Sequence, residues 1–156
     1  MSADIIEYLE MWNGLVPPRA DAPYRSVADA ILQHGRAWPR INDGAWPRGE
    51  MKQCFANSQR LAMTHPELTY VEGYALNIIP VHHGWCVDAD GAVVDVTWER
   101  RDTNRYFGVP ILSRYIRKLT LATGVWTAVF DNWESKPPQP ILSGRHKPAV
   151  WLREWP

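Results

Sequence analysis

Three kinds of side chain in this sequence could together carry out nucleophilic chemistry: the thiol of Cys54, an imidazole of the pair His82-His83, and the carboxylate of Asp95. A cysteine nucleophile needs a lowered thiol pKa, a base that accepts its proton, and a group that orients the base. Cys54 falls in the first turn or two of a helix predicted from about residue 50 to residue 64. Free N–H groups and the helix dipole stabilise a thiolate there.

The turn between two predicted strands decides which histidine shares a face with Asp95. A two-residue loop at Asp90-Gly91 would place His82 on that face. A type I turn over residues 88–91, with a bulge at the glycine, would instead make His83 a diagonal neighbour of Asp95, about 7–8 Å away at the backbone. Asp at the first and Gly at the fourth turn position favour the second register, so we predict His83 as the base and keep His82 as the alternative.

The elements that must position these residues follow from hydrophobic spacing and turn residues. We expect an α+β fold in which a small antiparallel sheet packs against the helix that bears the nucleophilic Cys54. Residues 106–110 are expected to pack against the last helix, or alternatively to fold over the site as a lid. The predicted helices span about 3–12, 25–35, 50–64 and 110–122, and the predicted strands 68–79, 82–87 and 92–98, with a further possible strand at 126–130.

Composition limits the class of protein. The 156 residues contain 17 Lys and Arg against 17 Asp and Glu, and 46% are hydrophobic. These values predict a single domain over 1–156, with a core at about 50–98 and a Pro- and Trp-rich C-terminal arm at about 135–156. Zero formal net charge argues against a nucleic-acid partner, because such binding needs clustered basic residues.

No apolar run approaches the roughly 20 residues that span a bilayer, so we expect no membrane partner. The N-terminal residues are acidic and lack the basic region of a secretory signal. Two cysteines are too few for a disulfide framework. We therefore expect a cytoplasmic protein with reduced thiols.

Residues 50–98 resemble the transglutaminase-like core, within the wider group of papain-like cysteine enzymes. That family has a Cys that opens a helix, a strand that ends in Gly-Tyr, a His-Ala-Trp strand and an Asp-Pro-Thr strand. The matching segments here are Cys54 in QCFANSQRLA, YVEGY at 70–74, HGW at 83–85 and DVT at 95–97. Gly84 and Val96 depart from the pattern, and Gln53 stands where the family often has Gly or Val.

The resemblance implies a Cys-His-Asp triad in which Cys54 is the nucleophile, His83 the general base and Asp95 the orienting acid, with no cofactor. The implied activity is cysteine-dependent acyl transfer, as an amide or peptide hydrolase or a transglutaminase-type enzyme acting on a protein or peptide. The Cys54 N–H, with Trp46 or Gln53, is the expected oxyanion donor set.

Aromatic residues near the predicted triad are candidates for substrate binding. Trp85 is expected as a core or cleft wall beneath the histidine, and Trp46 and Trp98 lie in loops where they could line a groove with Gln53. If no oxyanion donor is supplied, the alternative is a catalytically inactive transglutaminase-like module that binds a protein or peptide. A third possibility, a small structural or host-interaction protein, is suggested only by the Trp-rich tail.

A metal site is the competing chemistry for the same residues. Cys54, His83 and Cys86 could offer three ligands, but strand parity places His83 and Cys86 on opposite faces of the sheet. The chain also contains no C-x-x-C pair, which is typical of structural zinc sites. We therefore expect no metal.

Overall fold

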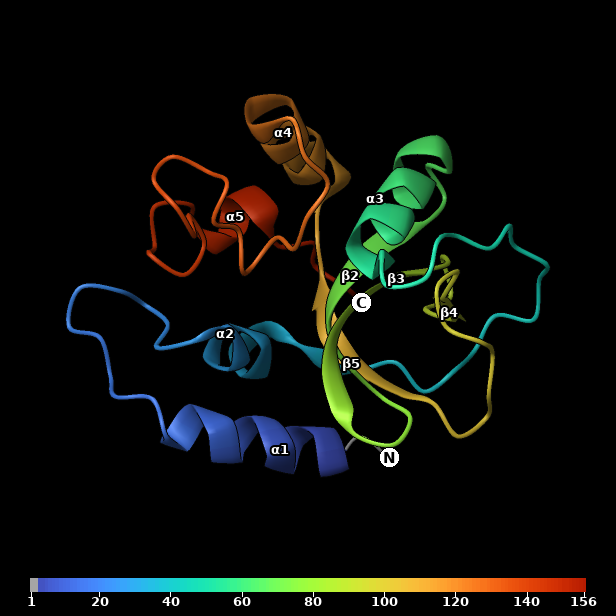
Figure 1. Ribbon diagram of the computed structural model, residues 1–156, viewed down its shortest axis with the longest axis horizontal. Helices are drawn as coiled ribbons and strands as arrows, with labels where there is room; N and C mark the ends of the chain where they lie inside the picture. Colours follow the sequence, from blue (N-terminus) through green and yellow to red (C-terminus); the bar gives the residue numbers. More distant parts are fainter. Residues whose placement is uncertain (1–2) are drawn as a thin grey trace.

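A curled five-stranded antiparallel sheet forms the centre of the α+β fold in the computed structural model, which describes residues 3–156 (Figure 1). The strand order is β1-β5-β2-β3-β4. The strands are β1 Arg36–Ala37, β2 Thr69–Leu76, β3 Pro80–Val87, β4 Val93–Val94 and β5 Arg105–Pro110. The helices are α1 Ala3–Gly14, α2 Val27–His34, α3 Cys54–Thr64, α4 Ser113–Thr123 and α5 Pro148–Trp151.

The long strands β2 and β3 form the hairpin that carries most of the candidate site. They are paired from Thr69 opposite Val87 to Leu76 opposite Pro80. β2 also pairs with β5 along its other edge, and residues on both of its faces are buried. Its sequence, TYVEGYAL, is rich in the β-branched and aromatic residues that suit a strand buried on two sides.

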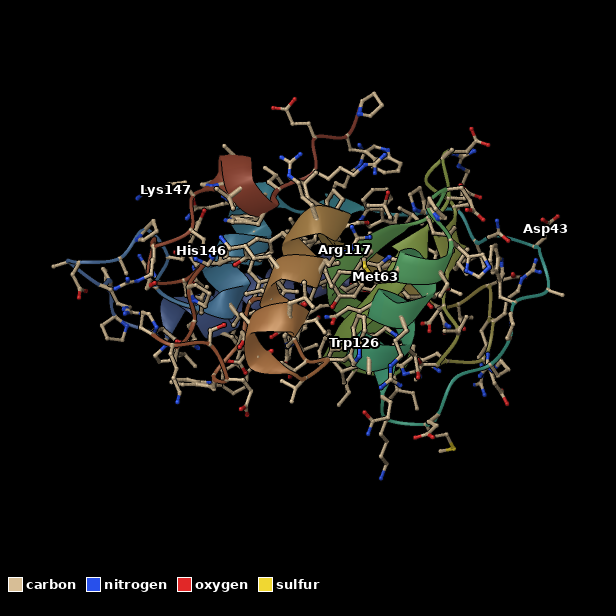
Figure 2. The ribbon with its side chains drawn as sticks, turned by 90° about the horizontal axis from the view of Figure 1, so that it is seen from above. Asp43, Met63, Arg117, Trp126, His146 and Lys147 are labelled. Carbon is tan, nitrogen blue, oxygen red and sulfur yellow. The ribbon has the colours of Figure 1, made fainter. Side chains whose placement is uncertain are left out.

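Two hydrophobic clusters cover the two faces of this sheet. The larger cluster includes residues from all five helices, for example Ile5, Ile31, Ala62 and Ile116. The smaller cluster contains no helical residue: Trp38, Trp85 and Tyr106 lie under long loops. The helices therefore cover one face and loops cover the other (Figure 1). Seen from above in Figure 2, α4 with Arg117 lies beside α3 with Met63.

Residues 106–110 form a strand and not a lid, and Phe107 and Val109 share the larger cluster with Ile116 of α4. They lie in β5, between β1 and β2. Gly108 allows this close pairing, because a Cβ there would lie 2.8 Å from the Glu72 carbonyl oxygen and 2.7 Å from the Trp85 ring. Pro110 ends the strand rather than beginning the helix, and α4 starts at Ser113.

The sheet therefore contains five strands instead of the three expected. Two of the predicted strands also differ: residues 92–98 shorten to β4, and residues 126–130 form no strand.

The arm at 135–156 is not extended. Its side chains Ile141 and Trp151 are buried, and the Trp155 ring packs edge-on against Trp38 at 5.0 Å.

The nucleophile-bearing helix begins later than predicted, at Cys54 rather than Glu50. Residues 50–53 form a turn in which the Gln53 N–H donates to the Glu50 carbonyl at 3.3 Å. Lys52 adopts a left-handed conformation with φ of 64°, which is unfavourable for a lysine and incompatible with a continuous helix. Cys54 is consequently the first residue of α3.

None of the helices between residues 3 and 156 is long and apolar enough to cross a bilayer.

Candidate active site

The turn between β3 and β4 has the bulged geometry that selects His83. Gly91 has φ of 77°, its N–H donates to the Asp88 carbonyl at 3.0 Å, and the Asp88 N–H donates to the Ala92 carbonyl at 3.0 Å. Cys86 lies opposite Val94, as the type I turn with a glycine bulge requires. The predicted register is confirmed.

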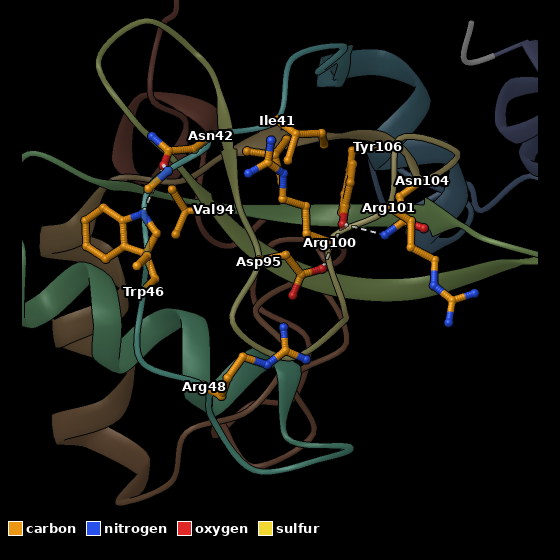
Figure 3. Close-up of a pocket in the computed structure, with 13 residues that line it drawn as sticks. Ile41, Asn42, Trp46, Arg48, Val94, Asp95, Arg100, Arg101, Asn104 and Tyr106 are labelled. Carbon is orange, nitrogen blue, oxygen red and sulfur yellow. Dashed lines mark hydrogen bonds between the residues drawn. The ribbon is translucent and has the colours of Figure 1, made fainter.

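His83 and Asp95 form a buried hydrogen-bonded pair. The distance from His83 Nε2 to Asp95 Oδ2 is 2.7 Å, and the exposed fractions of the two side chains are 2% and 6%. Asp95 Oδ1 accepts the backbone N–H groups of Thr97 at 2.9 Å and Trp98 at 3.0 Å. The Tyr106 hydroxyl donates to Oδ2 at 3.0 Å, as Figure 3 shows. Four donors thus fix the carboxylate, which in turn fixes the imidazole.

The electrostatics of the pair favour a cationic ring and an anionic carboxylate. Burial lowers the pKa of His83, but hydrogen bonds and negative charge from Asp95 and Cys54 more than offset it and raise the pKa to about 9. Burial also raises the pKa of Asp95, yet the hydrogen bond and charge of His83, together with the backbone N–H groups, bring it below its ordinary value. At neutral pH the site therefore holds an imidazolium beside a carboxylate.

Cys54 lies at the N-terminus of α3 and lines an open cleft of about 400 Å³ together with His83. The first N–H groups of a helix have no acceptor within it, and their dipoles attract negative charge. Since Nε2 of His83 is bonded to Asp95, Nδ1 is the nitrogen available to the thiol. The structure thus brings together all three residues of the predicted triad.

The two tryptophans next to the triad take different positions. Trp98 lines the cleft, and its ring centre lies 4.4 Å from that of His83. Trp85 is completely buried beneath the imidazole, with ring centres 6.2 Å apart and an angle of 21° between the planes. Trp98 therefore presents its ring to the cleft, whereas Trp85 supports the histidine from the core.

Trp46 and Gln53 do not reach this cleft. The Trp46 indole N–H donates to Asn42 Oδ1 at 3.0 Å, and its ring packs on His65. It lines a separate cavity of about 210 Å³ on the far side of Asp95 (Figure 3). Gln53 precedes the first helical residue and lines a third hollow beside Arg60. Neither side chain can serve as the expected oxyanion donor in this arrangement.

A network that the sequence did not indicate ties the start of α3 to the Asp95 loop. The Arg48 guanidinium donates to the carbonyl oxygens of Trp98 at 2.6 Å and Thr97 at 3.1 Å. The Asn57 amide donates to the Glu50 carbonyl at 2.8 Å and to the Thr97 hydroxyl at 2.9 Å. These contacts set the thiol and the acid in fixed relation, although Cys54 begins α3 and Asp95 lies in the loop after β4.

His82 points to the opposite face from His83, as strand alternation predicts. Its Nε2 lies 3.1 Å from Glu72 Oε1, so it has a carboxylate partner of its own. The role of Glu72 was missed. An ionisable residue at the centre of the buried strand TYVEGYAL is the signal that could have revealed it.

The second cysteine lies apart from this chemistry. Cys86 is buried on the helix-covered face of the sheet, and its thiol donates to the Ser58 carbonyl at 3.2 Å. Burial raises the pKa of this thiol far above its ordinary value. Both thiols are free, and residues 3–156 contain no group of three His, Cys, Asp or Glu side chains arranged to hold a metal.

Comparison with protein-family models, with curated proteins and with solved structures finds no match to this chain. The function must therefore be argued from the site itself. A thiol at a helix N-terminus, a cationic imidazole and a buried carboxylate form an arrangement suited to nucleophilic attack on a carbonyl carbon.

Proposed function

We propose that this protein is a cysteine-dependent acyl-transfer enzyme of the transglutaminase-like type, with Cys54 as nucleophile, His83 as acid and base, and Asp95 as the orienting group. The observation that supports this most strongly is the 2.7 Å bond between His83 and Asp95 at a cleft that also contains Cys54. The pairing is costly to bury, which favours a functional role for it.

The chemistry follows from the protonation states of the site. The proton of the Cys54 thiol is held by His83, and the thiolate is stabilised by the imidazolium and by the helix N-terminus. The sulfur attacks an amide or ester carbonyl, and His83 returns the proton to the leaving group. Water or an amine then attacks the thioester, with His83 removing its proton. Asp95 holds the ring in one tautomer throughout.

The cleft suits an extended peptide or protein acyl donor. Its walls combine apolar side chains, Phe55, Val81 and Trp98, with the exposed Met51 at its rim. An open, partly apolar groove accommodates a polypeptide segment better than a small polar metabolite. Hydrolysis, deamidation and amine transfer all begin with the same acyl-enzyme.

The two cysteines allow an internal test of thiol activation. Iodoacetamide at about pH 6 should alkylate Cys54 rapidly in the native protein, while Cys86 stays unmodified, because an ordinary thiol is protonated at that pH. His83→Ala should slow the reaction at Cys54 by on the order of 10²-fold or more. Peptide mapping by mass spectrometry reads each cysteine separately, and equal slow alkylation in both proteins would contradict the proposal.

A second measurement detects the acyl-enzyme directly. 4-Nitrophenyl acetate should give an acetyl adduct on Cys54 and sustained release of nitrophenol. Cys54→Ala should abolish both, whereas Cys86→Ala should leave them unchanged. Turnover that persists in Cys54→Ala would show that this thiol is not the nucleophile.

A non-catalytic module that binds a protein or peptide is the second candidate. One observation favours it: the Trp46 and Gln53 side chains, expected as oxyanion donors, both lie outside the cleft. A module of this kind would bind a peptide in the groove beside Trp98 without forming an acyl adduct. Slow alkylation of Cys54 together with peptide binding that is lost in Trp98→Ala would support this candidate.

A further inference from the structure

A second imidazole–carboxylate pair borders the same cleft from the other face of β3. His82 Nε2 lies 3.1 Å from Oε1 of Glu72, whose side chain has an exposed fraction of 0%. Glu72 also accepts the Tyr70 hydroxyl at 2.7 Å and the backbone N–H groups of Val129 at 2.7 Å and Phe130 at 3.0 Å. The tyrosine hydroxyl and the two backbone N–H groups all donate to Glu72, and Nε2 of His82 shares the carboxyl group with them.

The ring of His82 is also held by aromatic neighbours. It stacks on Tyr74 with 5.5 Å between ring centres and 20° between planes, and the Phe55 ring lies 4.9 Å away. The ring lines the cleft of Cys54 with 22% of its side chain exposed. With Nε2 turned to the core, Nδ1 is the nitrogen left for a bound molecule.

The network around Glu72 lies within electrostatic reach of the nucleophile. Burial and the Glu72 charge raise the pKa of Tyr70 well above its ordinary value, and the charge of Cys54 contributes in the same direction. A buried carboxylate is unfavourable unless its acceptor sites are used. The hydrogen bonds of Glu72 include the one to His82, which holds that imidazole at the wall of the cleft.

A developing negative charge in the cleft needs a hydrogen-bond donor that is already held in place. The Thr97 hydroxyl and the Trp98 indole N–H can donate there, and Lys52 carries its charge on a long exposed side chain. His82 lines the same cleft and is neither the nucleophile nor the base. Its restraint by stacking and by Glu72 matches what an oxyanion donor requires, since such donors act without reorganising.

We propose that His82, held by Glu72, is the oxyanion-stabilising residue of the acyl-transfer reaction, an inference that rests on the proposed function. When the thiolate sulfur bonds to the carbonyl carbon, the carbonyl π pair moves onto the oxygen. The ring of His82 donates Nδ1–H to that oxygen, alongside the Cys54 N–H, while its Nε2 stays bonded to Glu72. As the intermediate collapses, the C=O bond re-forms, the leaving group departs with a proton from His83, and His82 keeps its own protons.

Comparing alkylation with acyl transfer distinguishes stabilisation of the oxyanion from an effect on the reactivity of the thiol. Iodoacetamide reacts by displacement of iodide and forms no oxyanion, whereas hydrolysis of 4-nitrophenyl acetate does. His82→Phe keeps an aromatic ring between Tyr74 and Phe55 but removes both nitrogens. We expect it to lower kcat for the ester about 10²- to 10³-fold with little change in KM, while the alkylation rate of Cys54 stays within about twofold.

His82→Gln tests the same point with a side chain that retains an N–H donor, and it should recover part of the lost kcat. His146→Ala removes an imidazole outside the cleft and should match the parent protein. Unchanged ester turnover in His82→Phe, or in His82→Leu if the first variant does not fold, would overturn the inference. Alkylation that falls in parallel with turnover would also overturn it, because His82 would then act on the thiol. Turnover that survives Cys54→Ala would instead defeat the proposed function.

Discussion

The two histidines at the centre of β3 are adjacent in sequence yet belong to different environments. His83 faces the loop-covered side and bonds to Asp95, which lies only twelve residues away across a hairpin. His82 faces the helix-covered side and bonds to Glu72 on the neighbouring strand β2. Each pair joins an imidazole to a buried carboxylate, but the supports of the two carboxylates differ.

The supports of Asp95 are local, and those of Glu72 are distant. Two of the donors to Asp95 are N–H groups two and three residues ahead of it. Glu72 instead accepts N–H groups from residues 129 and 130, almost sixty positions away. The first carboxylate therefore belongs to a tight turn that presents His83, while the second also anchors the segment between α4 and the C-terminal arm. We expect chemistry to depend mainly on the first and stability mainly on the second.

Asp95→Asn should give the largest effect on chemistry. The amide cannot stabilise the imidazolium and can donate to Nε2, which favours the wrong tautomer of His83. We expect the rate of Cys54 alkylation at pH 6 and the ester kcat/KM to fall on the order of 10³-fold. Thermal unfolding should show a folded protein. Alkylation at the parental rate would mean that Asp95 has no part in activating the thiol.

Glu72→Gln should have the opposite profile. The new amide turns donor hydrogens toward backbone N–H groups that need an acceptor, which leaves buried polar groups unpaired. We expect the free energy of unfolding to fall by about 2–4 kcal/mol, measured by urea denaturation. The folded fraction should still alkylate at Cys54. A loss of alkylation equal to that of Asp95→Asn, with stability unchanged, would remove the distinction between the two pairs.

The locality of the Asp95 pair explains why it could be predicted from the sequence. The turn DADG fixes the register of a hairpin, and strand alternation then places His83 and Asp95 on one face without any knowledge of the rest of the chain. The α+β class followed from the same periodicities. The start of α3 was placed four residues early, because helical spacing continues through a turn that the left-handed Lys52 interrupts.

The parts that were missed depend on contacts that no such turn signal marks. β5 contains Gly and Pro, which usually indicate a loop, yet Gly108 is the residue that lets the strand approach Trp85. Trp46 was assigned to the cleft because it precedes the nucleophile closely in sequence, but its bond to Asn42 turns it to another cavity. Glu72 and His82 are only ten residues apart, but the connection between β2 and β3, Asn-Ile-Ile at 77–79, contains no glycine that would mark a turn and set the register.

The pH dependence of stability should report on the His83–Asp95 pair, with a smaller effect than the substitutions above. The pKa of His83 is about 9 in the folded protein, above its ordinary value of 6.5, so its stabilising contribution is complete below pH 6.5 and is lost as pH rises through 9. The pKa of Asp95 is lowered, so its contribution is present above its ordinary value of 3.8 and is lost as pH falls below that range. The melting temperature should therefore fall between pH 6.5 and 9, and His83→Gln should flatten this slope. A slope unchanged in His83→Gln would assign the titration to another group.

Tyr106→Phe should produce the smallest change and tests how far the supports of Asp95 matter individually. The hydroxyl donates to the same oxygen, Oδ2, that accepts His83. Its removal leaves the His83 bond and both backbone donors in place, so we expect a loss of about 0.5–1.5 kcal/mol, or about three- to tenfold in alkylation rate. Tyr115→Phe is the matched control, because that hydroxyl bonds to His146, away from the cleft. A loss as large as that of Asp95→Asn would show that the tyrosine, rather than the turn, holds the carboxylate in position.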